Sequence, residues 1–271
     1  MKITDNEYKY SIITLAFCSA FTHFTVSSPD REVYSAERIY CIAISVFLSL
    51  FVAILIDRID FNKNVFRYPA LLIIVFRMIY TVCRYVQYYQ IFYGEGAAGI
   101  IFLTAVVTVL LLVYKNSNIK SMYYFFLVSN LLIGILVLIM STGLMNTANI
   151  YSNYVSIRGN YDTVFVFFDV FTIAVILKDK KDRRQVQKRF LSISAVVFAA
   201  VTLLQGLCIK GDLLYSISPL QSLVQVFSGE TVKRYDYVFN ILFTINYFGA
   251  VVLYGFTIRE LINKEKSIEN S

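Results

Sequence analysis

One carboxylate and two guanidinium groups stand inside stretches of sequence that are otherwise apolar. The stretch from Thr163 to Leu177 reads TVFVFFDVFTIAVIL, with Asp169 near its middle. In a second apolar stretch, Arg77 and Arg84 lie seven residues apart, which places them on one face of a helix. An aspartate at the middle of a membrane helix costs about 2.5 to 3.5 kcal/mol and normally faces a bundle interior with a partner. We therefore predict that Asp169 pairs with one of these arginines.

Such a pair allows two interpretations. It could be a buried ion pair that only fixes helix packing, because buried pairs need not serve a ligand. It could instead form a binding site, since a guanidinium and a carboxylate satisfy the two charged groups of an amino acid, with aromatic side chains as apolar walls. The candidate ligand-binding residues are Asp169, Arg84, Arg77, Phe165, Phe168, Tyr80, Tyr88 and His23.

The composition indicates that these residues lie in a lipid bilayer. Hydrophobic residues make up 58% of the 271 positions and charged residues 16%, and the mean hydropathy is +0.63. Several apolar runs reach the length of about 20 residues that a helix needs to cross the hydrocarbon layer. The sequence therefore predicts an all-α integral membrane protein with about eight transmembrane helices. The predicted spans are Tyr10 to Val26, Arg38 to Ile56, Pro69 to Tyr93, Ala97 to Tyr114, Ile119 to Leu144, Asp162 to Leu177, Phe190 to Ile209 and Tyr237 to Phe256.

The distribution of Lys and Arg predicts the orientation in the membrane. Most of the 25 basic residues fall in segments on the side of the N-terminus, above all in the loop KDKKDRRQVQKR from Lys178 to Arg189. Cytoplasmic segments carry such an excess, so both termini are predicted to be cytoplasmic. Cytoplasmic segments and contact with anionic lipid both favour basic residues, which explains the net charge of +7. The basic loop lacks interleaved aromatic residues, so no nucleic-acid partner is expected.

The sequence offers little for enzyme chemistry. The four cysteines form no CxxC pair and His23 is the single histidine, so neither a disulfide framework nor a metal site is predicted. There is no Gly-rich phosphate loop and no nucleophile with a plausible base. We therefore expect no enzyme and no cofactor. The 21 tyrosines are expected to form the aromatic belts at the membrane interfaces, because Trp is absent.

The segment from about 212 to 230, DLLYSISPLQSLVQVFSGE, is too polar to cross the membrane. Its apolar residues Leu213, Ile217, Leu220 and Val224 fall on one helical face, which predicts an amphipathic helix on the outer side. Two interpretations are open: the helix lies on the lipid headgroups, or it forms a lid over a cavity.

Three stretches together resemble the spore germination permeases, the B subunits of nutrient germinant receptors. The first is YSISPLQSLVQVFSGETVKRYDYVFNILFTINYFGAVVLY, in which Arg234 and Asp236 form an Arg-x-Asp motif that opens the next helix. The others are CRYVQYYQIFYGEG and VFVFFDVFTIAVILKDKKDRRQVQKRF. The resemblance implies the amino acid, polyamine and organocation transporter superfamily, with two inverted five-helix repeats and a substrate site between the first and sixth helices. It also implies A- and C-type partner subunits, a nutrient ligand and the spore inner membrane.

The chain departs from that pattern, and three functions stay open. Eight spans indicate a shortened inverted-repeat fold, with residues 1–258 as the membrane domain and 259–271 as a cytoplasmic tail. The segment from Asn160 to Leu177 contains neither Gly nor Pro, so the sequence predicts no helix break there. These departures favour a receptor subunit that senses a small nutrient such as an amino acid. The alternatives are an amino-acid transporter and a shortened membrane scaffold that binds no ligand.

Overall fold

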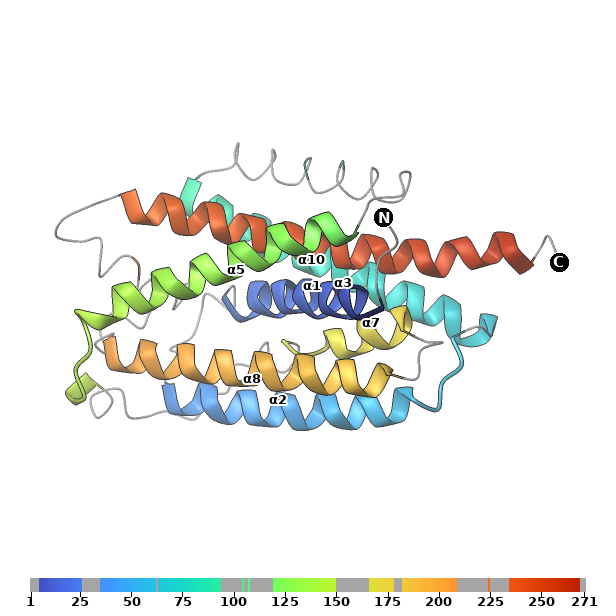
Figure 1. The fold of residues 1–271 in the computed structure, drawn as a ribbon, viewed down its shortest axis with the longest axis horizontal. Coiled ribbons are helices and arrows are strands. Elements are labelled where there is room, and N and C mark those ends of the chain that lie inside the picture. The colour runs from blue at the N-terminus through green and yellow to red at the C-terminus, as the bar shows by residue number, and fades with distance from the viewer. Residues whose placement is uncertain are drawn as a thin grey trace.

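The computed structural model consists of helices, with no strand among the residues that it describes. Seven helices appear in this part: α1 Asp5–Thr25, α2 Ser35–Ile56, α3 Asn64–Tyr93, α5 Ile119–Thr142, α7 Asp169–Ile176, α8 Arg183–Cys208 and α10 Arg234–Ile268 (Figure 1). The described residues are 5–25, 35–61, 63–93, 104, 107, 119–149, 166–177, 182–208, 224 and 234–268. The all-helical prediction is therefore confirmed for these residues.

Helix α1 lies in the middle of the bundle. From Ser11 to Thr25 every side chain is buried except Phe17, which is partly buried. A helix that is buried all round belongs to the core of a larger bundle. Figure 1 shows α1 between α5 and α10 on one side and α8 and α2 on the other. The bundle is therefore built around α1, and the site residues are positioned relative to this helix.

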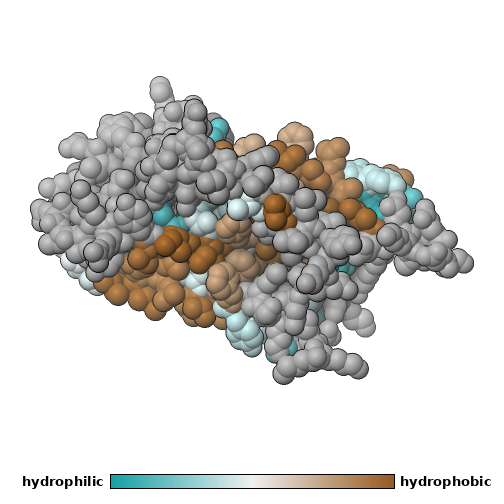
Figure 2. All heavy atoms as spheres, turned by 90° about the horizontal axis from the view of Figure 1, so that it is seen from above, coloured by the Kyte–Doolittle hydropathy of each residue, from teal (hydrophilic) through white to brown (hydrophobic). Residues whose placement is uncertain are grey.

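The surrounding helices turn large apolar side chains outward. Phe47 on α2 is 70% exposed, Phe76 on α3 71% and Val196 on α8 69%, and apolar side chains gather along the described helices in Figure 2. Such a surface is unfavourable in water but suits lipid. Five described helices are long and apolar enough to cross a membrane, at Ile39–Ile56, Asn64–Gln87, Tyr123–Thr142, Arg183–Cys208 and Val238–Ile262.

Several observed helices extend beyond the predicted spans, because hydropathy marks only the apolar part of a helix. The observed helices begin at Asp5 instead of Tyr10, at Asn64 instead of Pro69 and at Arg183 instead of Phe190, and α10 continues past Phe256 to Ile268. The second half of the predicted KDKKDRRQVQKR loop is thus helical. The predicted span at 97–114 lies outside the described residues except for Thr104 and Val107, so the count of eight stays a prediction.

Oppositely charged side chains meet where α2 ends and α8 begins. Asp57 accepts hydrogen bonds from Arg183, whose Nη2 lies 2.5 Å from Oδ1, and from Arg184. Lys9 of α1 pairs with Asp182 on the turn before α8. We call these five residues the end cluster. It ties α1, α2 and α8 together at one end of the bundle.

The two arginines control the ionisation of Asp57. Burial of its carboxyl raises the pKa, but hydrogen bonds and charge from Arg184 and Arg183 outweigh burial, and the pKa of Asp57 falls below its ordinary value. The pair therefore stabilises the folded protein while the carboxyl is ionised.

Helix α1 packs closely against α10 at Gly249. A Cβ atom at this position would lie 2.8 Å from Cys18 Cβ, 2.9 Å from Cys18 Sγ and 3.2 Å from Phe126 Cδ1. Real Cβ atoms do not approach other carbons this closely, so only glycine fits here without movement of α1.

We predict that Gly249→Ala lowers the free energy of unfolding by about 1 to 3 kcal/mol, because the new methyl group overpacks the contact with Cys18. Thermal unfolding of the protein in detergent measures the change. Gly134→Ala is the matched control, since nothing lies within 4 Å of its Cβ position, and it should keep or raise the unfolding temperature. Equal behaviour of the two variants would contradict the close α1–α10 contact.

We also predict an acid-dependent contribution from Asp57. Its folded pKa is lowered, so its stabilising effect is present above the unfolded value of about 4 and is lost as the pH falls through the folded value. Asp57→Asn and Arg183→Gln should each lower the unfolding temperature at pH 7 and should lose less of it on acidification than the native protein. Arg58→Gln, at the exposed neighbour of Asp57, should leave the acid profile unchanged.

Candidate functional site

Helix α7 begins at Asp169, inside the bundle. The chain enters the helix through a turn at Val166–Phe168, in which the amide of Phe171 donates to the carbonyl of Phe168 at 2.9 Å. With eight residues, α7 is roughly 12 Å long, which is less than half of the hydrocarbon thickness. Asp169 is 0% exposed. The carboxylate therefore stands at the positive end of a short helix in the protein interior, where the helix dipole favours it.

The predicted continuous span from Asp162 to Leu177 is thus wrong in its described part. The structure places a helix start at Asp169 although no Gly or Pro precedes it. The first amides of a helix have no intrahelical partners, and a negative charge in the first turn interacts favourably with them. Asp169 therefore favours a helix start at this position.

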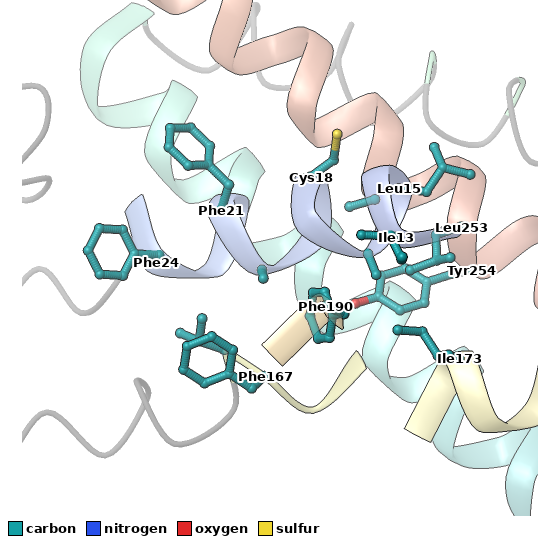
Figure 3. Close-up of a cluster of buried hydrophobic side chains, with 14 of the residues drawn as sticks. Ile13, Leu15, Cys18, Phe21, Phe24, Phe167, Ile173, Phe190, Leu253 and Tyr254 are labelled. Atoms are coloured by element: carbon teal, nitrogen blue, oxygen red, sulfur yellow. The ribbon is translucent and has the colours of Figure 1, made fainter. Parts of the chain in front are cut away.

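Two hydroxyl groups hold one oxygen of the Asp169 carboxylate. Tyr254 of α10 donates from its hydroxyl to Oδ1 at 2.9 Å, and Thr172 lies 3.5 Å from the same oxygen. Ser19 Oγ lies 2.6 Å from the Tyr254 hydroxyl. Since the single proton of Tyr254 goes to the carboxylate, Ser19 donates to Tyr254. Figure 3 shows Tyr254 reaching from α10 into the core beside Ile173 of α7.

The second oxygen of Asp169 faces Arg77. The guanidinium Nη2 of Arg77 lies 3.9 Å from Oδ2, within ion-pair range but beyond hydrogen-bond range. Among the described residues Oδ2 accepts no hydrogen bond. The Arg77 guanidinium also lies 5.9 Å from the centre of the Phe168 ring. One buried carboxylate oxygen is thus left for a further donor.

A second polar cluster continues along α3 from Arg77. Thr81 Oγ1 donates to the carbonyl of Arg77 at 2.8 Å and lies 3.0 Å from His23 Nε2. Because the hydroxyl proton of Thr81 is used, His23 donates from Nε2. The His23 ring stacks on Tyr80 at 5.9 Å, and Arg84 Nε donates to the Tyr80 hydroxyl at 3.0 Å. The cluster connects α1 to α3 beside the Asp169 pair.

The structure brings together some of the predicted site residues. Asp169, Arg77 and Phe168 are in contact, whereas Arg84 contacts Tyr80 and His23 contacts Tyr80 and Thr81. Of the two arginines proposed as partners, the ion pair forms with Arg77. The other predicted residues fall outside the described side chains: Phe165, Tyr88, Arg234 and Asp236, as does the predicted lid at 212–230 apart from the buried Val224. Helix α10 does begin at Arg234.

The sequence interpretation missed Tyr254 and Ser19. Tyrosines outside the candidate site, which contains Tyr80 and Tyr88, are expected in interfacial belts, but Tyr85, Tyr247 and Tyr254 are 0% exposed. Tyr85 and Tyr247 stack at 3.8 Å, and Tyr85 donates to Thr244 at 2.6 Å. Tyr247 lies near the middle of the predicted span from Tyr237 to Phe256, where a tyrosine hydroxyl needs a partner. Tyr254 lies two residues from the end of that span, so its position in the sequence did not distinguish it from an interfacial tyrosine.

Comparison with known proteins yields no relative. The chain matches no protein-family model, no curated protein and no solved structure. The resemblance to the spore germination permeases therefore stays a prediction from the sequence. Among the described residues, no group of three or more His, Cys, Asp or Glu side chains could hold a metal ion.

We predict that Tyr254→Phe lowers the free energy of unfolding by about 1 to 3 kcal/mol, because it removes a donor from a buried carboxylate and leaves Ser19 without its acceptor. Tyr40→Phe is the control, since Tyr40 is 71% exposed. Thermal unfolding of the two variants in the same detergent measures the difference. Equal unfolding temperatures would show that the Tyr254 hydroxyl contributes nothing to the Asp169 site.

Proposed function

We propose that this chain is a permease-like membrane receptor subunit that binds a small nutrient, an amino acid, at Asp169 and Arg77. The observation that carries the proposal is the buried carboxylate at the start of α7, which has one oxygen without a hydrogen-bond donor and a guanidinium at 3.9 Å. Burial removes both charged groups from water, and only direct hydrogen bonds between them would repay that loss of hydration. An ion pair that served only helix packing is therefore expected to be in hydrogen-bond contact.

The chemistry of the pair suits an amino acid. The ammonium group of the ligand would donate to Asp169 Oδ2, and its carboxylate would accept two hydrogen bonds from the planar guanidinium of Arg77. Phe168, which lies against that guanidinium, supplies an apolar wall. In the ligand-free protein the two charged groups face each other and partly neutralise each other's charge. Ligand entry would separate them and replace one ion pair with two.

The same geometry suggests how binding would produce a signal. Asp169 is connected to α1 through Ser19 and to α10 through Tyr254, so a ligand on Oδ2 acts on three helices at once. A shift of α7 relative to α1 and α10 would move the ends of the bundle and shift the population between two arrangements. This supports a sensor that passes a conformational change to partner subunits.

The location and partners follow from the resemblance and the charge pattern. We propose a multi-pass protein of the cell membrane, in a spore-forming organism the spore inner membrane, with A- and C-type receptor subunits as partners. The end cluster would face the cytoplasm, since basic residues concentrate on that side, and both termini would lie there. The surrounding membrane lipid would contact the apolar faces of α2, α3, α5 and α8.

The experiment is ligand-dependent thermal stabilisation of the purified protein with single amino acids. An amino acid at 100 times its Kd should stabilise the native protein by about 2.7 kcal/mol. Asp169→Asn and Arg77→Gln should fold but lose this stabilisation. Tyr85→Phe is the control, because it removes a buried tyrosine hydroxyl that contacts Thr244.

The outcomes separate the candidate functions. Stabilisation that survives in Asp169→Asn, or an absence of stabilisation by every amino acid, would contradict the proposed site and favour a scaffold. Uptake of the stabilising amino acid into proteoliposomes would favour a transporter over a sensor. In a spore-forming parent organism, deletion of the gene should abolish dipicolinic acid release with one nutrient and leave release by non-nutrient triggers intact.

A further inference from the structure

The buried face of α8 carries a row of polar side chains. Gln187 is 2% exposed, Ser194 0% and Thr202 1%. The outward face of the same helix is apolar, with Val196 at 69% and Leu203 at 48%. Thr202 follows Gln187 by fifteen residues, which corresponds to roughly 22 Å along the helix, most of the hydrocarbon thickness of about 30 Å. The helix therefore turns its polar side inward over much of its transmembrane length.

These polar groups lack hydrogen-bond partners. Gln187 Oε1, Ser194 Oγ and Thr202 Oγ1 are buried and bond to nothing in the described part of the chain. Buried threonines on α1 and α10 do bond to their own helix backbone: Thr22 donates to the carbonyl of Cys18 at 2.8 Å and Thr257 to that of Leu253 at 2.7 Å. A helical Ser or Thr that does not bond its own helix backbone presents its hydroxyl to something else.

Small polar molecules suit these groups. Each buried polar group without a partner is costly, and inside a membrane protein water or a polar solute that reaches it removes the cost. The row contains amide and hydroxyl groups and no charged side chain, so it favours uncharged molecules. At one end, Gln187 Nε2 donates to the carbonyl of Val170 at 3.1 Å. The row therefore passes directly beside the residue that follows Asp169.

An aromatic cluster interrupts the row between Ser194 and Thr202. Phe198, 0% exposed, stacks on Phe24 at 4.5 Å with an interplanar angle of 9° and lies 5.8 Å from Phe167. Phe17, seven residues before Phe24 on α1, lies 5.5 Å from Phe198. Figure 3 shows Phe24 on α1 and Phe167 on the segment leading into α7 in this part of the core. The four rings fill the space between α1, α8 and the start of α7.

We propose that α8 lines a path for water and small uncharged polar solutes, and that the ring cluster around Phe198 closes it. A ring of apolar side chains blocks such a path by excluding water. The structure is then the closed state, and rotation of Phe198 or a displacement of α8 from α1 opens it. This path does not depend on nutrient binding at Asp169.

The test is glycerol permeability of proteoliposomes, measured by stopped-flow light scattering with the full chain. Phe198→Ala should raise the permeability several-fold above that of the native protein. Phe76→Ala is the matched control, because Phe76 is 71% exposed on α3, and it should leave the permeability unchanged. Phe198→Leu, which keeps a large apolar side chain, should give a smaller rise and serves as the second variant if Phe198→Ala does not fold.

A second set of variants assigns the leak to α8. Adding Ser194→Ala and Thr202→Val to Phe198→Ala should return the permeability towards the native value, since the path then loses its polar groups. A folded Phe198→Ala protein with native permeability would overturn the proposal, as would a leak that the added substitutions leave unchanged. Amino-acid-dependent thermal stabilisation, measured on the same Phe198→Ala protein, reports nutrient binding, so loss of nutrient binding and loss of the path are separate results.

Discussion

The Asp169 carboxylate constrains the rest of this bundle, because it is fully buried among apolar helices and has no water to satisfy its charge. Its surroundings are supplied largely by three other helices: Tyr254 on α10 donates directly, Ser19 on α1 supports Tyr254, and Arg77 on α3 supplies the opposite charge. Helix α7 supplies its positive end at the same point. The position of the carboxylate therefore depends on how these helices pack against one another.

The packing around α1 follows from the same constraint. A helix that carries Ser19, Thr22 and His23 in its buried stretch can stay in a membrane only if other helices cover it. The close approach of α10 at Gly249 brings Tyr254 within reach, and Thr81 on α3 accepts a hydrogen bond from His23. Apolar side chains are then left for the outward faces of α2, α3, α5 and α8.

The end cluster and the interior of the bundle differ in how completely their polar groups are hydrogen-bonded. At the end cluster, Asp57 is held by two arginines and accepts hydrogen bonds on both oxygens. In the interior of the bundle, Asp169 Oδ2 and the hydroxyl groups of Ser194 and Thr202 have no hydrogen-bond partner among the described residues. A protein that only needed stability would distribute its hydrogen bonds the other way, since unsatisfied groups cost most where water is absent.

The sequence by itself indicated a lipid environment, a helical fold and the need for a partner at Asp169. Those conclusions depend on hydropathy, length and the cost of a buried charge, which are properties of local sequence. It also indicated that Arg77 and Arg84 share a face, but spacing along one helix cannot say which of them meets another helix. Only the tertiary structure selected Arg77, moved Tyr254 from an expected interfacial belt to the core, and started α7 at Asp169 without a Gly or Pro. These features depend on where α1, α3, α7 and α10 pack against one another, and such contacts between residues distant in sequence leave no periodic pattern in the chain.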